Sequence, residues 1–247
     1  MLDAHCHIDL YDDPHRVAVE SEELHIFTLA VTRLPSHFAE ACEYLTNFRY
    51  VRPGLGFHPL LASDFPAEIS QFEKLVSSAK YIGEIGLDFT VRDAEKKRRQ
   101  VELLDHILTL THNHEQVFSL HSRWAEAQVL DLLRRHDCRK CVFHWYSGSL
   151  KTLQKIIDAG YYLSINHQML ISKNGRSIIQ ATPHDRVLTE TDGPFIKLDG
   201  REIRPSDIKL AEEGLSEIWG TNLEDVDLRI RENLKNLLEQ GDLPPAL

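Results

Sequence analysis

Residues 116–145 read QVFSLHSRWAEAQVLDLLRRHDCRKCVFHW, and their pattern is the strongest indication of the fold. The stretch contains two short β-rich runs, 116–121 and 140–145, and each run carries a histidine at or near its end. Between them, apolar residues such as Val129 and Leu133 recur at spacings of three and four, which is typical of one face of an amphipathic helix. A strand, a helix and a second strand in this order predict a βα unit with parallel strands.

The same alternation runs along the whole chain of 247 residues. Strands are expected at 2–8, 25–31, 50–56, 80–86, 116–121, 140–145, 161–166 and 186–191. Helices are expected at 36–47, 66–79, 94–114, 124–136, 149–159, 173–181, 205–219 and 223–240. This α/β pattern favours a closed (β/α)8 TIM barrel, with a doubly wound parallel sheet as the alternative. Because we find no internal repeat, low-complexity segment or linker, we expect a single domain over residues 1–247.

The composition limits the classes of function. A formal net charge of −10 excludes binding to nucleic acid through bulk charge. A nucleic-acid substrate is still possible, because a bound cation can supply the positive charge that a phosphate requires. No apolar run reaches the roughly 18 residues of a membrane span, and Asp3, His5 and His7 interrupt the start of any signal peptide. We therefore expect a cytoplasmic protein without membrane association.

The cysteines are sparse, which does not suggest a secreted disulfide framework. They are Cys6, Cys42, Cys138 and Cys141. Cys138 and Cys141 form a Cys-x-x-Cys pair, which is compatible with half of a zinc knuckle, a redox pair or two ordinary thiols. No second Cys-x-x-Cys is present, so ordinary thiols are favoured.

Six potential metal ligands fall at or near the carboxyl ends of five predicted strands, where a barrel places its active site. They are His5 and His7 in the first strand, Glu84 in the fourth, His121 in the fifth, His144 in the sixth and Asp192 after the eighth. His5 and His7 point to the same side, because alternate residues of a strand share a face. Glu84 lies in a nearly apolar strand, where a buried carboxylate requires a cation or another partner. Taken singly, the later histidines could be core residues and the aspartate a helix cap, but their convergence favours a metal centre.

Several segments resemble, in order and spacing, the signature stretches of the TatD family of metal-dependent deoxyribonucleases: DAHCHIDL, GFHP, IGEIGLDF, LHSR, FHWYSG and ETDGP. The resemblance covers nearly the whole chain, and ETDGP and IGEIGLD are its most specific parts. It implies a TIM barrel of the amidohydrolase type, a two-metal site, and hydrolysis of DNA phosphodiester bonds from the 3′ end.

The resemblance also implies a role for each ligand. One cation would be held by His5, His7, Asp192 and Glu84, and a second by Glu84, His121 and His144. The two cations would polarise the phosphate and lower the pKa of a bridging water. Asp192 would orient that water and accept its proton, so Asp192 and Glu84 are the expected catalytic residues. Four imidazoles and two carboxylates suit zinc or manganese, whereas the resemblance points to magnesium, so the identity of the two divalent ions stays open.

Other residues near the predicted mouth are candidates for substrate binding. His58 belongs to GFHP, and Arg123 lies two residues beyond a predicted ligand, where it can meet a phosphate oxygen. Asp88 is expected to accept a hydrogen bond from the second ring nitrogen of a metal-binding histidine. The run EKKRR at 95–99 is either a track for the phosphate backbone or a solvated helix face.

Two dipeptides depart from the family pattern. Trp145 and Tyr146 stand where the family has small residues, and their rings could stack on a nucleobase or pack outside the barrel. Asn166 and His167 end the seventh strand, where small and apolar residues are expected, and His167 is a candidate substrate contact. These departures suggest the TatD-like component of the Qat anti-phage defence system, which would imply partner proteins including an ATPase.

The leading hypothesis is therefore a metal-dependent DNase acting on single-stranded DNA or 3′ ends. The alternative is a small-molecule amidohydrolase or phosphoesterase on the same barrel. Many relatives in that superfamily carry a carbamylated lysine where this chain has Glu84, which favours the nuclease. A third hypothesis is a binding subunit in which the metal only stabilises the barrel.

Overall fold

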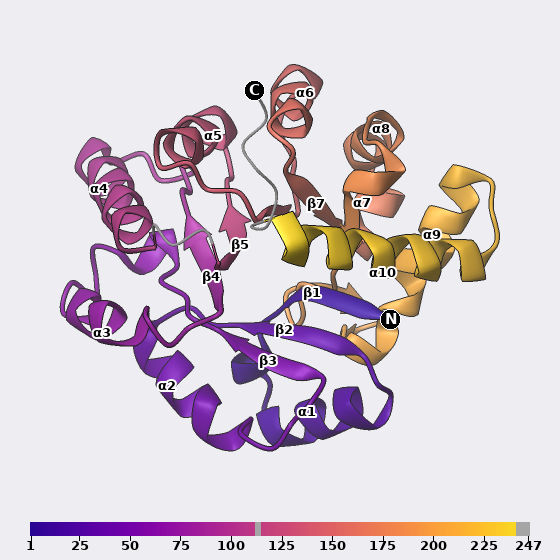
Figure 1. Cartoon of the computed structure of the whole chain (residues 1–247), viewed down its shortest axis with the longest axis horizontal. Helices are drawn as coiled ribbons and strands as arrows, with labels where there is room; N and C mark the ends of the chain where they lie inside the picture. The colour runs from indigo at the N-terminus through magenta and orange to yellow at the C-terminus, as the bar shows by residue number, and fades with distance from the viewer. Residues whose placement is uncertain (112–114, 241–247) are drawn as a thin grey trace.

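The computed structural model describes residues 1–111 and 115–240, and its parallel strands form a ring enclosed by helices (Figure 1). In chain order the ring strands are β1 (Leu2–Cys6), β2 (Phe27–Val31), β3 (Val51–Gly54), β4 (Tyr81–Gly86), β5 (Val117–His121), β6 (Cys141–His144), β7 (Tyr162–Ile165) and β8 (Val187–Thr189). Every strand predicted from the sequence is present, with its ends shortened.

Helices follow most of the strands and cover the outside of the ring. They are α1 (Pro14–Glu23), α2 (Pro35–Tyr44), α3 (Glu68–Leu75), α4 (Ala94–Leu110), α5 (Glu126–Arg135), α6 (Leu150–Asp158), α7 (His167–Ile171), α8 (Lys173–Ala181), α9 (Lys209–Trp219) and α10 (Leu223–Glu239). The eight predicted helices are found, although residues 112–114 of one of them lie outside the described part. The sequence analysis missed α1, α7 and a small hairpin formed by β9 (Lys197–Leu198) and β10 (Arg201–Glu202).

The ring is built from two hydrogen-bonded ladders of parallel strands, β1-β2-β3 and β4-β5-β6-β7-β8. At the seam beside β3, the amide of Gly83 donates to the carbonyl of Leu55 at 2.9 Å. At the other seam, the amide of Asp192 donates to the carbonyl of His5 at 2.9 Å, and that of His7 donates to Gly193 at 2.8 Å. Sequential strand order with β8 beside β1 agrees with the (β/α)8 barrel and excludes the doubly wound sheet.

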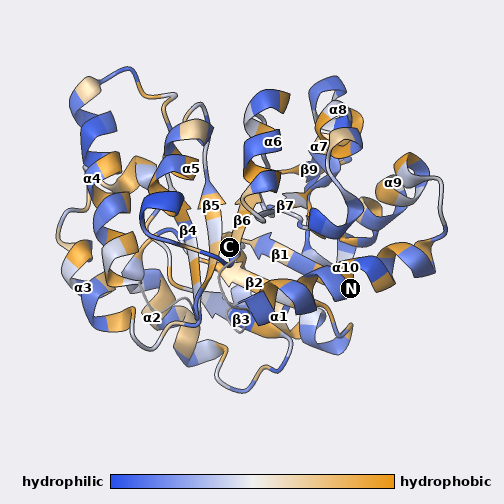
Figure 2. Ribbon diagram, turned by 45° about the horizontal axis from the view of Figure 1, so that its top comes forward, coloured by the Kyte–Doolittle hydropathy of each residue, from blue (hydrophilic) through white to orange (hydrophobic). Residues whose placement is uncertain are grey.

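Side chains alternate between the interior of the ring and the layer under the helices. In β5, the buried Phe118 and Leu120 lie in the large apolar core, whereas Ser119 is bonded to a side chain of β1 across the ring interior. The amphipathic α5 supplies Val129 and Leu133 to the same core. Figure 2 shows this pattern as hydrophilic and hydrophobic patches that alternate along the outer helices.

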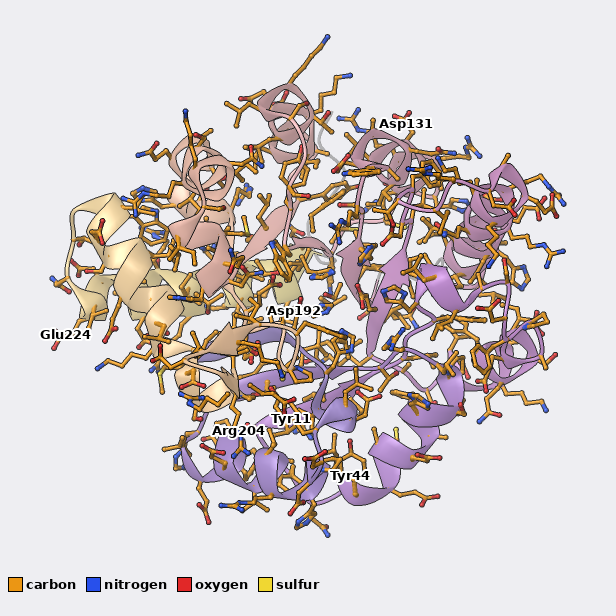
Figure 3. The ribbon with its side chains drawn as sticks, turned by 180° about the vertical axis from the view of Figure 1, so that it is seen from behind. Tyr11, Tyr44, Asp131, Asp192, Arg204 and Glu224 are labelled. Carbon is orange, nitrogen blue, oxygen red and sulfur yellow. The ribbon has the colours of Figure 1, made fainter. Side chains whose placement is uncertain are left out.

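The two ends of the barrel differ. Helix α10 covers the amino ends of the strands, where Asn233 donates to the carbonyls of His184 and Val187 at 2.7 Å each, and α10 crosses in front of the ring in Figure 1. The carboxyl ends face the opposite way, and Figure 3 shows Asp192 near the centre of that mouth. Among the helices that the structure describes, none is long and apolar enough to span a bilayer.

Candidate metal centre

The side chains predicted as metal ligands lie together at the mouth of the barrel. They are His5 on β1, His7 directly after it, Glu84 on β4, His121 at the end of β5, His144 at the end of β6 and Asp192 after β8. All are buried except His121, which is partly exposed. Strand β1 ends before His7, yet the two Nε2 atoms of His5 and His7 are 3.3 Å apart, so both rings point to the same place.

The carboxylate of Glu84 lies between two sets of imidazole nitrogens. Its Oε2 is 3.2 Å from Nε2 of His7 and 4.0 Å from Nε2 of His5. Its Oε1 is 2.5 Å from Nδ1 of His121 and 2.9 Å from Nε2 of His144. Oε2 also lies 3.5 Å from Nε2 of His58. The two carboxylate oxygens thus face different sets of nitrogens, which is the arrangement that a bridging ligand requires.

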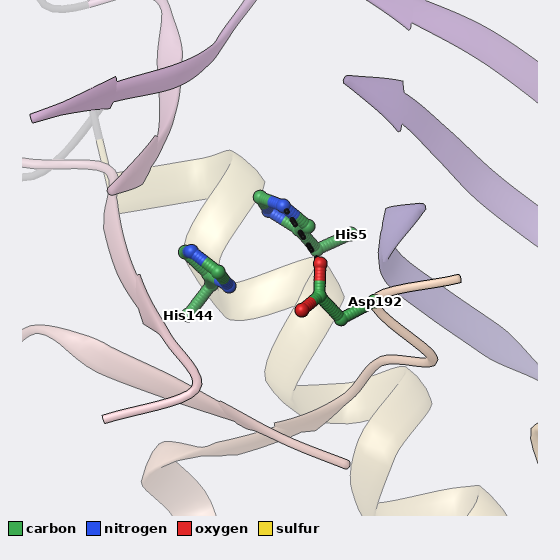
Figure 4. Close-up of side chains that lie close together, drawn as sticks. All are labelled: His5, His144 and Asp192. Atoms are coloured by element: carbon green, nitrogen blue, oxygen red, sulfur yellow. Dashed lines mark ion pairs between the residues drawn. The ribbon is translucent and has the colours of Figure 1, made fainter. Parts of the chain in front are cut away.

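Asp192 completes the first of these sets. Its Oδ1 lies 3.6 Å from Nε2 of His5 and 3.8 Å from Nε2 of His7. Figure 4 shows its carboxylate beside the rings of His5 and His144, which stack with their centroids 3.8 Å apart. Ligand atoms of these three residues all lie within 4.8 Å of one another, and the same holds for His5, His7 and Glu84.

The donor set fits divalent cations. Four imidazoles and two carboxylates form a mixed nitrogen and oxygen set, which borderline metals prefer. Pairs of ring nitrogens approach each other, with Nδ1 of His121 and Nε2 of His144 only 3.4 Å apart. Nδ1 of His7 is buried and has no hydrogen-bond partner among the described residues. Buried lone pairs that converge in this way need a cation or a proton between them.

The ionisation of the cluster follows from burial and mutual charge. Burial alone would raise the pKa of Glu84, but the imidazoles of His58, His121 and His144 together hold it well below its usual range. Burial lowers the pKa of His5 well below its ordinary value. Burial raises the pKa of Asp192 well above its ordinary value, although the nearby His144 opposes the shift. A cation in the cluster would lower it again, because positive charge favours the carboxylate.

Two polar side chains fix the orientation of ligand rings. Oγ of Ser119 lies 2.7 Å from Nδ1 of His5, which leaves Nε2 directed at the cluster. Oδ2 of Asp88 lies 3.0 Å from Nε2 of His121, and hydrogen bonds with His121 and Thr90 hold the pKa of Asp88 at about 2 against the effect of burial. The contact expected for Asp88 is therefore present, whereas Ser119 was missed, although it lies two residues before His121 on the same face of β5.

Sequence reasoning also missed Glu190, a carboxylate in the quoted ETDGP segment. It is buried and accepts hydrogen bonds from the amide of Trp145 at 3.0 Å, from Asn166 at 2.9 Å and from the hydroxyl of Ser164. Its Oε1 also lies 3.8 Å from Nδ1 of His144. Glu190 thus ties the ends of β6, β7 and β8 together behind the ligands.

The cluster forms the floor of a cavity of about 370 Å³. Among the predicted substrate contacts, His58, Arg123 and Trp145 line it. Nδ1 of His58 accepts from the amide of Leu60 at 3.2 Å, so a neutral ring carries its proton on Nε2, 3.5 Å from Oε2 of Glu84. The sequence analysis did not single out Arg33 and Phe195, which also line the cavity.

The other predicted contacts do not line this cavity. Tyr146 is 1% exposed, packs near Phe143 and donates its hydroxyl proton to the carbonyl of Ser149, so its ring has no face for a base. His167 begins α7 and is partly exposed, but it is not among the lining residues. Asn166 is fully buried, caps α7 and is bonded to Glu190.

The basic run at 95–99 forms an ion-paired, solvent-exposed face of α4. Arg98 pairs with Glu95 at 2.6 Å and with Glu102, and Arg99 pairs with Glu95 at 3.1 Å. These contacts favour the solvated face over the phosphate track. Both cysteines of the Cys-x-x-Cys pair are buried free thiols.

A parallel barrel with buried histidines and carboxylates at its mouth defines a metal-dependent hydrolase. The chain belongs to the TatD related DNase family, whose model matches residues 2–239. It is 27% identical to a putative deoxyribonuclease, TATDN3, of Mus musculus over 92% of this chain and 84% of that protein. It is also 27% identical to the uncharacterized metal-dependent hydrolase YcfH of Escherichia coli K12, over 96% of this chain and 95% of that one. The crystal structure of YJJV, a TatD homologue from E. coli K12, has the same fold, with a TM-score of 0.86, 23% identity and coverage of 99% and 98%.

Proposed function

We propose that this enzyme hydrolyses phosphodiester bonds at the end of a DNA strand, using two divalent cations. The observation that carries the proposal is the position of Glu84, whose two oxygens face different sets of imidazole nitrogens. The family membership of the chain supports DNA as the substrate, because its relatives include deoxyribonucleases. Mg²⁺, Mn²⁺ and Zn²⁺ are the candidate ions.

In this proposal the ligands fall into two sets that share one residue. His5, His7 and Asp192 would hold one cation, and His121 and His144 would hold the other. Glu84 would bind both cations. Such a pair of cations stabilises the charge of an in-line displacement at phosphorus and activates water for attack.

The protein supplies the remaining steps. Oδ1 of Asp192 faces His5 and His7, so its Oδ2 is the oxygen left to orient the attacking water and accept its proton. Arg33 and Arg123 line the cavity, and no ion pair of either is found among the described residues, so both guanidinium groups are available for phosphate oxygens. The Nε2–H of His58 can donate to a phosphate oxygen from the same wall.

The size of the cavity favours attack at a strand end. About 370 Å³ is near the lower limit of small-molecule sites, so it accommodates roughly one nucleotide. We infer that the terminal nucleotide enters the cavity while the rest of the strand leaves over the rim. Together with the family resemblance, this favours 3′–5′ exonuclease digestion of single-stranded DNA.

The test compares two substrates under the same conditions. Purified protein is analysed for bound metal and then incubated with labelled single-stranded DNA, or with a p-nitrophenyl carboxylate ester, in Mg²⁺, Mn²⁺ or Zn²⁺. We expect stepwise shortening of the DNA, and a loss of about 10²- to 10⁴-fold in the Asp192→Asn variant if Asp192 is the base. Intact DNA together with consumption of the ester would instead favour the small-molecule hydrolase.

The cellular setting of the enzyme is a separate matter from its chemistry. A cytoplasmic location, a single domain and a role in anti-phage defence with protein partners stay predictions. The last can be tested by asking whether Asp192→Asn abolishes protection of cells that carry the chain with its neighbouring genes.

A further inference from the structure

A second hollow, of about 310 Å³, opens on the rim next to the metal centre. It lies between the start of α5 and the start of α6, which are neighbours in Figure 1. Three loops each contribute residues to both spaces. Asp88, Arg123 and Trp145 line the metal cavity, and Phe89, Trp124 and Ser149 of the same loops line the hollow. The two openings therefore suit successive parts of one polynucleotide chain.

The wall of this hollow carries the most exposed large apolar side chain in the described part of the protein. Trp124 is 67% exposed and has a backbone φ of +60°. A bulky residue rarely adopts this conformation. Here the conformation places a large ring in solvent, where the ring adds nothing to the apolar core. Phe89, whose amide donates to the carbonyl of Arg123 at 2.9 Å, offers a second ring in the lining, and the ammonium group of Lys97 lies 5.1 Å from the centroid of that ring.

The polar lining of the hollow favours a nucleobase over a phosphate group as its ligand. Gln128, Ser149 and Thr152 are neutral hydrogen-bonding side chains. The charged side chain in the lining is Glu126, which accepts a hydrogen bond from the amide of Trp124 at 3.3 Å. A carboxylate repels phosphate but accepts hydrogen bonds from base amino groups. Two cations adjoin lining residues along the chain: Arg123, which faces the metal cavity, where the phosphate would lie, and Lys151, an exposed residue of α6 that is not in the lining.

We infer that this hollow is a nucleobase subsite, in which the ring of Trp124 stacks on a base next to the nucleotide held at the metal centre. The inference rests on the proposed DNase function and extends it, because it predicts that the enzyme recognises at least two nucleotides. Aromatic stacking tolerates every base, so the subsite adds affinity for single strands whatever their sequence.

Binding is measured first, with metal present and with phosphorothioate linkages in the DNA, so that the metal centre stays loaded and hydrolysis is slow. A fluorescein-labelled octathymidylate is titrated with the full chain and followed by anisotropy, and the unlabelled octamer by tryptophan fluorescence. Trp124→Ala should weaken binding by about tenfold or more and remove most of the quenching, whereas Trp124→Phe should retain part of the affinity. The control is Leu228→Ala, an exposed apolar residue on α10 at the opposite end of the barrel. Equal affinity of Trp124→Ala and the wild type would overturn the inference.

Cleavage is measured second, with two substrates that differ in the neighbouring base. The methyl ester of thymidine 5′-phosphate has neither an adjacent nucleotide nor a second aromatic ring, whereas the octamer has the adjacent nucleotide. In Trp124→Ala the ratio of KM for the octamer to KM for the ester should rise by about tenfold or more, and an unchanged ratio would contradict the subsite. If the wild type cleaves neither substrate in any of the three metals, the proposed function fails, and the binding experiment alone decides on the subsite.

Discussion

Glu84 and His121 are joined by a contact of 2.5 Å between Oε1 and Nδ1, and the far side of the same imidazole, Nε2, lies 3.0 Å from Asp88. The ring therefore lies between two carboxylates and cannot rotate without losing one of them. Both carboxylates come from β4 or the residues directly after it, whereas the ring comes from β5. The position of one candidate metal ligand is thus set by the neighbouring strand.

The first prediction concerns Asp88, which contacts the side of the His121 ring that faces away from Glu84. Asp88→Asn keeps the size of the side chain but removes the charge that orients and polarises His121. We expect metal affinity to fall by about 10- to 100-fold, measured by calorimetric titration of metal-free protein. Asp64→Asn, an exposed aspartate 3.9 Å from Lys96, is the control. Unchanged affinity in Asp88→Asn would show that the contact has no role in metal binding.

The second prediction concerns the bridge. Glu84→Gln replaces one of the two oxygens shared between the nitrogen sets by an amide nitrogen, which cannot bind a cation. Elemental analysis should find fewer ions per chain than in the wild type, and DNA digestion should slow by at least about a hundredfold. Glu95→Gln on the exposed face of α4 is the control. A variant that retains the full metal content would exclude Glu84 as the bridging ligand.

The third prediction compares two tyrosines, both labelled in Figure 3. The hydroxyl of Tyr11 is buried and donates to the carbonyl of Ile203, in the segment that follows Asp192. Tyr11→Phe leaves that carbonyl without its donor, so the free energy of unfolding should fall by about 1–3 kcal/mol. The hydroxyl of Tyr44 is buried without a partner among the described residues, so Tyr44→Phe should be neutral or stabilising. Denaturant titration measures both, and equal losses would contradict this account.

The fourth prediction concerns pH. Glu212 on α9 is 4% exposed, and burial, with the nearby charge of Asp227, raises its pKa to about 7. An acid whose pKa is higher in the folded protein than in the unfolded chain stabilises the fold below the unfolded value, and this contribution is lost as the pH rises through the folded value. From pH 5 to pH 8, the free energy of unfolding of Glu212→Gln should therefore increase relative to the wild type, by up to about 3 kcal/mol.

The neighbouring residue provides the control for this comparison. Glu213 is exposed and pairs with Lys209 at 3.3 Å, so Glu213→Gln should show no such dependence on pH. Thermal unfolding at several pH values measures all three proteins. Parallel curves for Glu212→Gln and the wild type would show that Glu212 is ionised in the fold throughout this range.

The strand runs, and the convergence of the six candidate ligands at one mouth, could be predicted from the sequence because both follow from regular spacings and strand ends. The eight strands follow from β-rich runs between helical patterns, and a barrel directs the residues at their carboxyl ends to one mouth. The start of α1 carried a usable signal, since Asp13 accepts from the amide of Arg16 and Pro14 is the first helical residue. Its few apolar residues gave little helical periodicity, and the helix was missed.

Loop residues could not be predicted in this way. Trp145 has a φ of +38°, and this turn sends the next side chain, Tyr146, into the core instead of the mouth. No spacing in the sequence indicates such a turn. Arg33 and Phe195 reach the cavity from loops after β2 and β8, where a charged or aromatic residue looks the same whether it faces substrate or solvent.

The hydrogen bond from Asp192 to His5 has a consequence for synthesis of the protein. The amino-terminal histidines leave the ribosome early, but their aspartate partner follows 187 residues later, after most of the chain has been made. A growing or truncated polypeptide cannot assemble the complete centre before its last strand joins its first. The proposed DNase would thereby stay inactive until translation has nearly finished.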